Sequence, residues 1–132
     1  MATFVLAAVD GSPESLAAAG WAADEAVRRG LPLHLVYAWP WPQHAAPGLP
    51  GVSEARGLAV SMLADAAERA RADHPGLTVD VALVDEPAPA GITAAAASAE
   101  LLVLGRTGHH LGPVTRTVIH DARCPVVVVP HA

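Results

Sequence analysis

Residues 101–130 read LLVLGRTGHHLGPVTRTVIHDARCPVVVVP, and this stretch decides the fold. Leu101 to Leu104 is an apolar run that is too short for a helix and ends at Gly105, so it predicts a strand buried on both faces. A helix is expected from Pro113 to about Asp121, because proline favours the first helical position. The apolar run Val126 to Val129 predicts a final strand.

The loop between the first of these strands and the helix contains three glycines, Gly105, Gly108 and Gly112. Glycine lets a backbone come close to a ligand, and a helix start points unpaired N–H groups toward an anion. The loop therefore predicts a phosphate site. Its other expected contacts are Arg106, Thr107, Val114 and Thr115.

A second strand-to-helix unit opens the chain. The apolar run Phe4 to Val9 predicts a strand that ends at Asp10-Gly11. Ser12 then supplies an N-cap, Pro13 supplies the first helical residue, and Gly30 ends the helix.

Spacing along the helices predicts their buried and exposed faces. In the first helix the predicted buried stripe is Leu16, Gly20, Ala23 and Val27. Its predicted exposed ion pairs are Asp24 with Arg28 and Glu25 with Arg29. A second helix is expected from an N-cap at Ser53 to about Asp73, with Leu58, Met62 and Ala66 on its buried face.

Three further segments complete the pattern. Leu33 to Trp39 reads as a strand, and the proline-rich residues 39–51 read as a loop. Leu77 to Val84 alternates apolar and polar residues, which is typical of a strand at a sheet edge. An alanine-rich helix follows Pro87 and Pro89 and runs through Ile92 to about Ser98.

Alternation of strands and helices predicts a five-stranded parallel sheet with helices on both faces. Ligands bind such sheets beyond the carboxyl ends of the strands, where Asp10 and the Gly105 loop both lie. If the first strand neighbours the fourth, these two loops form the walls of one crevice.

Composition limits the class of protein. The chain has 132 residues, enough for one domain, and 52% of them are hydrophobic. It has no lysine and a formal net charge of -5, so nucleic acid is not an expected partner. Cys124 is its single cysteine, and no run reaches the length of a membrane helix. We expect a cytoplasmic protein without a signal peptide or a membrane partner.

Two segments resemble the universal stress protein family: VLAAVDGSPESLAAAGWAADEAVRRGLPLHLVYAW near the start, and LLVLGRTG with VIHDARCPVVVVP near the end. The resemblance implies a single-domain three-layer α/β/α fold over residues 1–132, with strand order 3-2-1-4-5, as in adenine nucleotide alpha hydrolase-like proteins. It also implies an adenine nucleotide ligand (ATP, ADP or AMP) and a homodimer formed through the last strand, Val126, Val127, Val128 and Val129.

Nucleotide-binding members of that family hold the phosphates on a loop of Gly, two residues, Gly, nine residues, Gly, and Ser or Thr. By resemblance, Asp10 with its neighbour Gly11 and the backbone of Ala38 would hold the nucleoside, and Gly105 and Gly108 match the first glycine pair. The pattern then breaks, because only three residues separate Gly108 from Gly112, and Pro113 replaces the Ser or Thr.

Both departures weaken the phosphate site. Four residue steps span at most ~14 Å, so the loop is too short to wrap a triphosphate. Proline also removes one N–H donor and a hydroxyl at the helix start. A smaller anion, or a nucleoside with fewer phosphates, fits this loop better than ATP does.

Structural alternatives exist for each candidate residue. Asp10 can fix its own turn, and Gly105 with Gly108 can permit close packing of a helix on a strand. His109 and His110 read as solvated, and Cys124 reads as a packed thiol. Trp39 and Trp41 either cover a purine or cover the core edge. No metal site is expected, because His120 and Cys124 supply two ligands where a closed zinc site needs four.

Three functional hypotheses follow. The first is a binding and signalling module in stress response, with no catalysis of its own, that holds an adenine nucleotide weakly. The second is a member that has lost nucleotide binding and acts as a dimeric interaction protein. The third, a nucleotide hydrolase or transferase, lacks any assembled catalytic set or P-loop lysine in the sequence.

Overall fold

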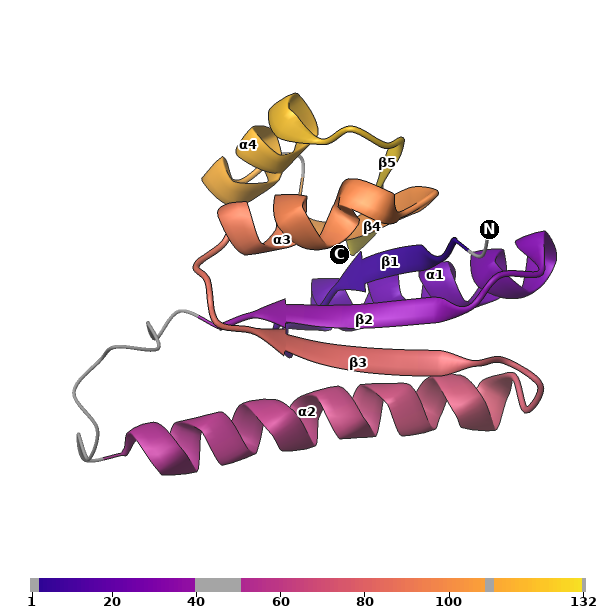
Figure 1. Cartoon of the computed structure of the whole chain (residues 1–132), viewed down its shortest axis with the longest axis horizontal. Coiled ribbons are helices and arrows are strands. Elements are labelled where there is room, and N and C mark those ends of the chain that lie inside the picture. The colour runs from indigo at the N-terminus through magenta and orange to yellow at the C-terminus, as the bar shows by residue number, and fades with distance from the viewer. Residues whose placement is uncertain (1–2, 40–50, 109–110, 132) are drawn as a thin grey trace.

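The computed structural model describes residues 3–39, 51–108 and 111–131, in which strands and helices alternate (Figure 1). The expectations for Trp41, His109 and His110 therefore lie outside the described residues. The strands are β1 (Val5–Ala8), β2 (Leu33–Ala38), β3 (Val79–Val84), β4 (Leu101–Thr107) and β5 (Val126–His131). The helices are α1 (Pro13–Arg29), α2 (Val52–Asp73), α3 (Ala90–Ala95), the 3-10 turn Ala96–Ser98, and α4 (Pro113–Asp121).

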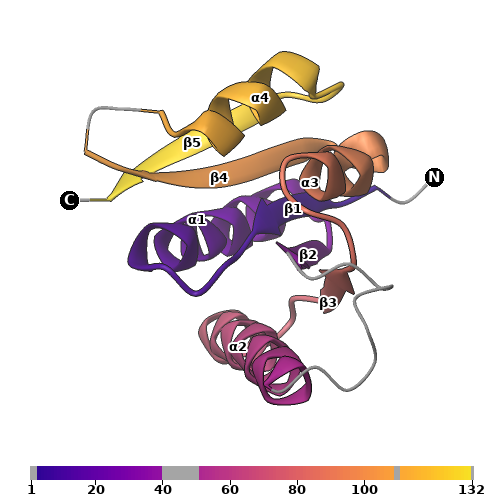
Figure 2. The same cartoon turned by 90° about the vertical axis from the view of Figure 1, so that its left-hand side faces the viewer.

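The five strands form one parallel sheet in the order β3-β2-β1-β4-β5, which confirms the expected topology. Helices α1 and α2 cover one face of the sheet, and α3 and α4 cover the other (Figures 1 and 2). A separate apolar core fills each interface, so the fold has three layers. Since β1 pairs with β4, the loops that follow these two strands meet at the carboxyl edge of the sheet.

The central strands are buried on both faces because a core lies on each side of them. Val5 and Ala7 of β1 belong to the core under α1 and α2, whereas Leu6 between them belongs to the core under α3 and α4. Alternate residues point to opposite faces of a strand, and here both directions lead to apolar surroundings. This is why the central strands read as continuous apolar runs.

The ends of α1 follow the predicted signals. The Ser12 side chain accepts a hydrogen bond from the Ser15 amide at 3.2 Å, and Pro13 is the first helical residue. Gly30 ends the helix at φ +67°, a left-handed conformation that residues with a side chain rarely adopt. The start of α2 differs from the prediction, because its N-cap is Gly51 at φ +85° rather than Ser53.

The predicted buried faces of α1 and α2 are only partly right. Ala23 is buried, and Met62 and Ala66 pack against the core. Val27, however, is 49% exposed and Leu58 is 72% exposed, and most of the residues that meet the sheet are alanines. The residues buried in α1 are Ser15, Ala18, Ala19, Ala22, Ala23 and Ala26, and those buried in α2 are Ala59, Leu63, Ala67 and Ala70. Small side chains let a helix axis lie close to the sheet, and that close approach leaves the larger residues at its margins.

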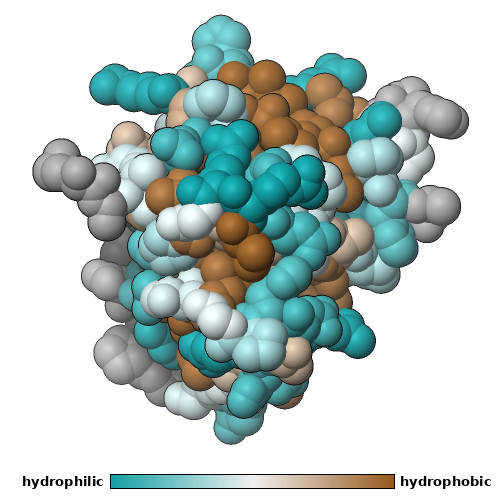
Figure 3. All heavy atoms as spheres, turned by 90° about the vertical axis from the view of Figure 1, so that its right-hand side faces the viewer, coloured by the Kyte–Doolittle hydropathy of each residue, from teal (hydrophilic) through white to brown (hydrophobic). Residues whose placement is uncertain are grey.

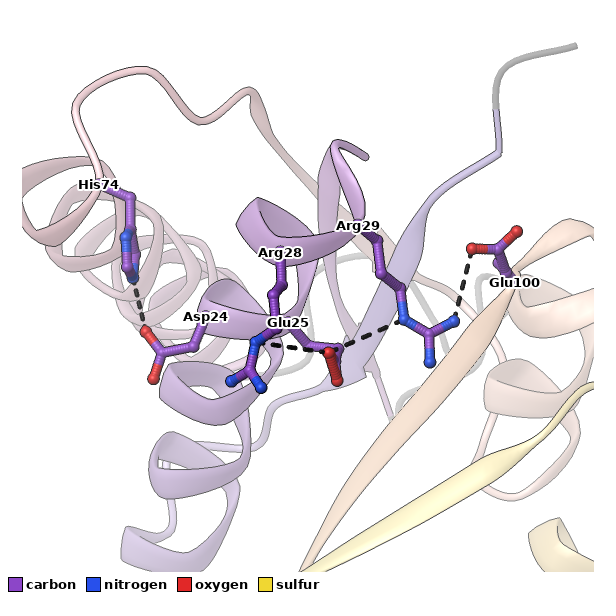
Figure 4. Close-up of polar contacts among 6 residues, drawn as sticks. All are labelled: Asp24, Glu25, Arg28, Arg29, His74 and Glu100. Atoms are coloured by element: carbon purple, nitrogen blue, oxygen red, sulfur yellow. Dashed lines mark hydrogen bonds and ion pairs between the residues drawn. The ribbon is translucent and has the colours of Figure 1, made fainter.

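Charged side chains link α1 to its neighbours (Figure 4). Glu25 lies 3.9 Å from both Arg28 and Arg29, and Arg29 also reaches Glu100 at 3.4 Å. This confirms the predicted pair of Glu25 with Arg29. The predicted pair of Asp24 with Arg28 is wrong, because the Asp24 carboxylate instead lies 2.7 Å from His74 Nε2 at the end of α2.

Gly105 sets the distance between α1 and β4. A Cβ atom at this position would collide with the carbonyl oxygen and carbon of Glu14, in the first turn of α1. Both colliding atoms belong to backbone, so a side-chain rotation cannot relieve the overlap. The packing interpretation of this glycine is therefore confirmed.

Replacement of Gly105 by valine should destabilise the fold by about 2 kcal/mol or more, because α1 must move away from β4. Urea denaturation followed by circular dichroism measures this loss. Gly112→Ala is the matched control, since a Cβ at Gly112 meets nothing within 4 Å. Equal stability of the two variants would contradict the packing role of Gly105.

Candidate functional site

A crevice of about 630 Å³ lies at the carboxyl edge of the sheet, where the loops after β1 and β4 meet. Residues from β1, β2, β4 and the starts of α1 and α4 line it, together with the segment that leads into α3. The lining residues are Ala8, Val9, Asp10, Ser12, Glu14, Ser15, Val36, Tyr37, Ala38, Pro87, Ala88, Ile92, Leu104, Gly105, Arg106, Thr107, Gly112, Val114 and Thr115.

Most of the predicted site residues come together in this crevice. The ones that line it are Asp10, Ala38, Gly105, Arg106, Thr107, Gly112, Val114 and Thr115. Two predicted residues, Gly11 and Gly108, are not among its lining residues. Both adopt left-handed conformations, at φ +88° and +67°, so they shape the two loops without forming the wall.

The crevice has an apolar part and a polar part. Val36, Ala38 and Ile92 supply apolar side chains that also belong to the core under α3 and α4. Asp10, Glu14 and Arg106 supply its charged side chains, and several hydroxyl residues also line it. A ligand with a flat apolar portion and a polar, anionic portion matches this division.

The turn after β1 holds Asp10 in place. The Ser12 amide donates to Asp10 Oδ1 at 2.9 Å, and the Asp10 amide donates to Ser15 Oγ at 3.2 Å. Partial burial raises the pKa of the Asp10 carboxyl, but the hydrogen bonds with Ser12 and Ser15 lower it more, so the pKa lies below its ordinary value of 3.8. Asp10 is therefore an ionised acceptor at neutral pH.

The start of α4 presents backbone donors to the crevice. Gly112 is the N-cap with extended backbone, Pro113 occupies the first turn, and no side chain caps this end among the described residues. Val114 and Thr115 follow in the first turn and line the crevice. The first N–H groups of a helix have no partner within the helix, so they can donate to an anion here.

Several lining residues were missed by the sequence reasoning. Ser12 and Ser15 follow Asp10 closely, and their hydrogen bonds to its turn could have been expected from the sequence spacing. Glu14 was overlooked because an acidic residue in a first helical turn is ordinary. Tyr37 and Ile92 carried no local signal, since only the sheet order brings them to this edge.

The remaining candidates have structural roles. Trp39 is 4% exposed, contacts Tyr37 edge-on at 6.2 Å between ring centroids, and does not line the crevice, so it covers the core edge. Cys124 is half-buried against the core under α3 and α4, and burial raises the pKa of its thiol. A packed, protonated thiol is a poor nucleophile.

Within residues 3–39, 51–108 and 111–131, no group of three or more His, Cys, Asp or Glu side chains is arranged to hold a metal ion. None of the helices in the same ranges combines the length and the hydropathy that a membrane crossing requires.

A second hollow, of about 640 Å³, lies at the opposite end of the sheet, between the ends of α1 and α2. Figure 3 shows that apolar surface interrupts the polar surface on this side of the molecule. Val27, Leu31 and Leu77 give the hollow its apolar lining. It contains the carboxyl ends of two helices, which repel anions, and it lies away from the carboxyl edge of the sheet. The crevice is the better functional candidate.

The model of the universal stress protein family matches residues 1–130. The chain belongs to the universal stress protein family. This membership agrees with the two segments that carried the resemblance and with the strand order of the sheet. The protein is therefore a module of the stress-response type.

Relatives support the same assignment. A universal stress protein of Mycobacterium tuberculosis is 34% identical over an alignment 142 residues long, which covers 96% of this chain and 48% of that protein. One from Mycobacterium bovis is 37% identical over 139 residues, covering 94% of this chain and 44% of that protein. The chain thus spans about half the length of these relatives.

Solved structures share the fold closely. A universal stress protein from Archaeoglobus fulgidus has a TM-score of 0.80 at 27% identity, over 97% of this chain and 93% of that chain. The structure of the universal stress protein from Archaeoglobus fulgidus in complex with dAMP has a TM-score of 0.77 at 26% identity, over 97% of both chains.

The turn around Asp10 makes the stability of this protein depend on pH. Because the folded pKa of Asp10 lies below 3.8, its contribution is complete above that value and is lost as the pH falls through the folded pKa. We expect Asp10→Asn to lower the urea midpoint at neutral pH and the difference from the wild type to shrink below pH 3.8. Asp65→Asn, at an exposed position of α2, is the control. A difference that does not change with pH would contradict this role.

Proposed function

We propose that this stress-response module binds an adenine nucleotide in the crevice and has no catalytic activity of its own. The observation that supports this most is that one crevice brings together the ionised Asp10, an apolar wall and the start of α4, which no side chain caps among the described residues. A nucleotide needs these three environments, for its ribose hydroxyls, its phosphate and its base.

The base would lie against the apolar part of the crevice. Val36, Ala38 and Ile92 supply a surface without charge, and the backbone at the end of β2 offers polar groups beside it. Flat aromatic ligands bind well where apolar walls carry a few polar groups at their edge. The dAMP complex of the Archaeoglobus fulgidus protein gives independent support for an adenine ligand on this fold.

The sugar and the phosphate would occupy the polar part. Asp10 would accept hydrogen bonds from ribose hydroxyls, because an ionised carboxylate is a strong acceptor. The amides of Val114 and Thr115, with Arg106 and Thr107 opposite, would contact the phosphate. The short step from Gly108 to Gly112 supplies fewer donors than the longer family loop, so we propose weak binding.

Pairing of two copies through β5 is the second part of the proposal. β5 is an edge strand, and its apolar residues Val126 to Val129 are only half-buried. The opposite edge strand, β3, carries Asp80. An edge strand with no charge among four valines favours pairing with another chain, whereas a charged edge resists it. A cytoplasmic homodimer that acts through protein contacts remains the alternative if no nucleotide binds.

Replacement of Asp10 by alanine should weaken AMP binding at least about tenfold, since hydrogen bonds to a charged group contribute about 1.5–3 kcal/mol. Titration calorimetry with AMP, together with mass spectrometry of co-purified small molecules, measures this effect. Asp65→Ala removes the same side chain from an exposed position of α2 and should bind like the wild type. Absence of binding by the wild type at millimolar AMP would refute nucleotide binding, and unchanged affinity of the Asp10 variant would place the site elsewhere.

A charge on β5 should separate the two copies. Val128→Glu is the preferred change, because it leaves the three core-packing valines in place. Val127 and Val129 pack against the core under α1 and α2, and Val126 packs against the core under α3 and α4. Analytical ultracentrifugation should show a dimer for the wild type and a monomer for the variant, with circular dichroism to verify folding. Val81→Glu on the other edge strand should leave the dimer intact. A dimer that survives the change at Val128 would locate the interface on another surface.

A further inference from the structure

Glu14 borders the crevice next to Gly105. It belongs to the first turn of α1 and lines the crevice, and its carbonyl oxygen faces the Cα atom of Gly105 so closely that no Cβ fits between them. Arg106 and Thr107 continue from Gly105 along the same wall. Glu14 and the Gly105–Thr107 segment are therefore neighbours in the lining of the crevice.

The charges that line the crevice do not favour a polyanion. Among the described lining residues, Asp10 and Glu14 are acidic and Arg106 alone is basic. Asp10 is held ionised by its turn, as described above. A triphosphate entering this crevice would bring several negative charges toward two carboxylates and a single guanidinium.

The two helix starts at the crevice differ in their capacity for anions. At α1 the Ser12 side chain caps the helix, and Glu14 places a negative charge in the first turn, which offsets the positive end of the helix dipole. At α4 the first turn contains no acidic residue and no side-chain cap among the described residues. The start of α4 is therefore the better anion site.

We infer that Glu14 is a specificity-determining residue that makes the crevice select nucleotides with a single phosphate group over triphosphates. This inference rests on the proposed function, since it concerns the same crevice. One phosphate contacts the α4 amides and Arg106, and each further phosphate adds negative charge that the Glu14 carboxylate repels. By Coulomb's law in water, each added negative charge at about 8 Å from the Glu14 carboxylate weakens binding about twofold.

Titration calorimetry with adenosine, AMP and ATP tests the inference, in a buffer with EDTA so that no divalent cation neutralises the phosphates. The wild type should bind AMP about fivefold more tightly than ATP. Glu14→Gln should tighten ATP binding about three- to tenfold more than AMP binding and should leave adenosine unchanged. Glu54→Gln is the matched control, because Glu54 is the acidic residue in the first turn of α2 and does not line the crevice.

A salt titration of the wild type gives a second measurement that needs no variant. Screening shortens the range of repulsion, so the ratio of AMP to ATP affinity should fall toward one as the salt concentration rises. Equal binding of AMP and ATP at low salt, or equal effects of Glu14→Gln on both, would overturn the role of Glu14 and leave nucleotide binding intact. Failure of every nucleotide to bind would refute the proposed function itself.

Discussion

The contact between the first turn of α1 and the end of β4 is the constraint on which the crevice depends. It is a backbone contact, made possible because Gly105 has no side chain next to the Glu14 carbonyl. The Asp10 turn and the Arg106-Thr107 segment, which lie next to this contact, both line one hollow.

The two sides of this hollow differ in their hydrogen bonding. The β1 side is satisfied internally, since Asp10, Ser12 and Ser15 bond to one another and fix an acceptor in place. The α4 side keeps its backbone donors for a ligand, because glycine and proline precede them and neither supplies a capping side chain. The fixed acceptor on one side and the backbone donors on the other are the two features that support the proposed nucleotide site.

Sequence reasoning succeeded where the signal was local and failed where it depended on packing. The caps of α1, the start of α4 and the five apolar strand cores follow from residues close in sequence, and all appear in the structure. The faces of α1 and α2 could not be read in the same way. Leu58 and Val27 looked like core residues because they are large, yet alanines such as Ala59 and Ala26 occupy most of the interface, since small side chains let a helix pack closely on a sheet.

By itself the sequence determined the alternation of strands and helices, the family, the Asp10 turn and the shortened glycine loop, because each depends on a few neighbouring residues. Tertiary structure alone decided that Glu14 borders the crevice, that Trp39 is buried outside it, and that Asp24 pairs with His74. Each of these facts joins elements that are distant along the chain. Their distances depend on strand order and on how closely each helix approaches the sheet, and side-chain volume at the interface sets that approach.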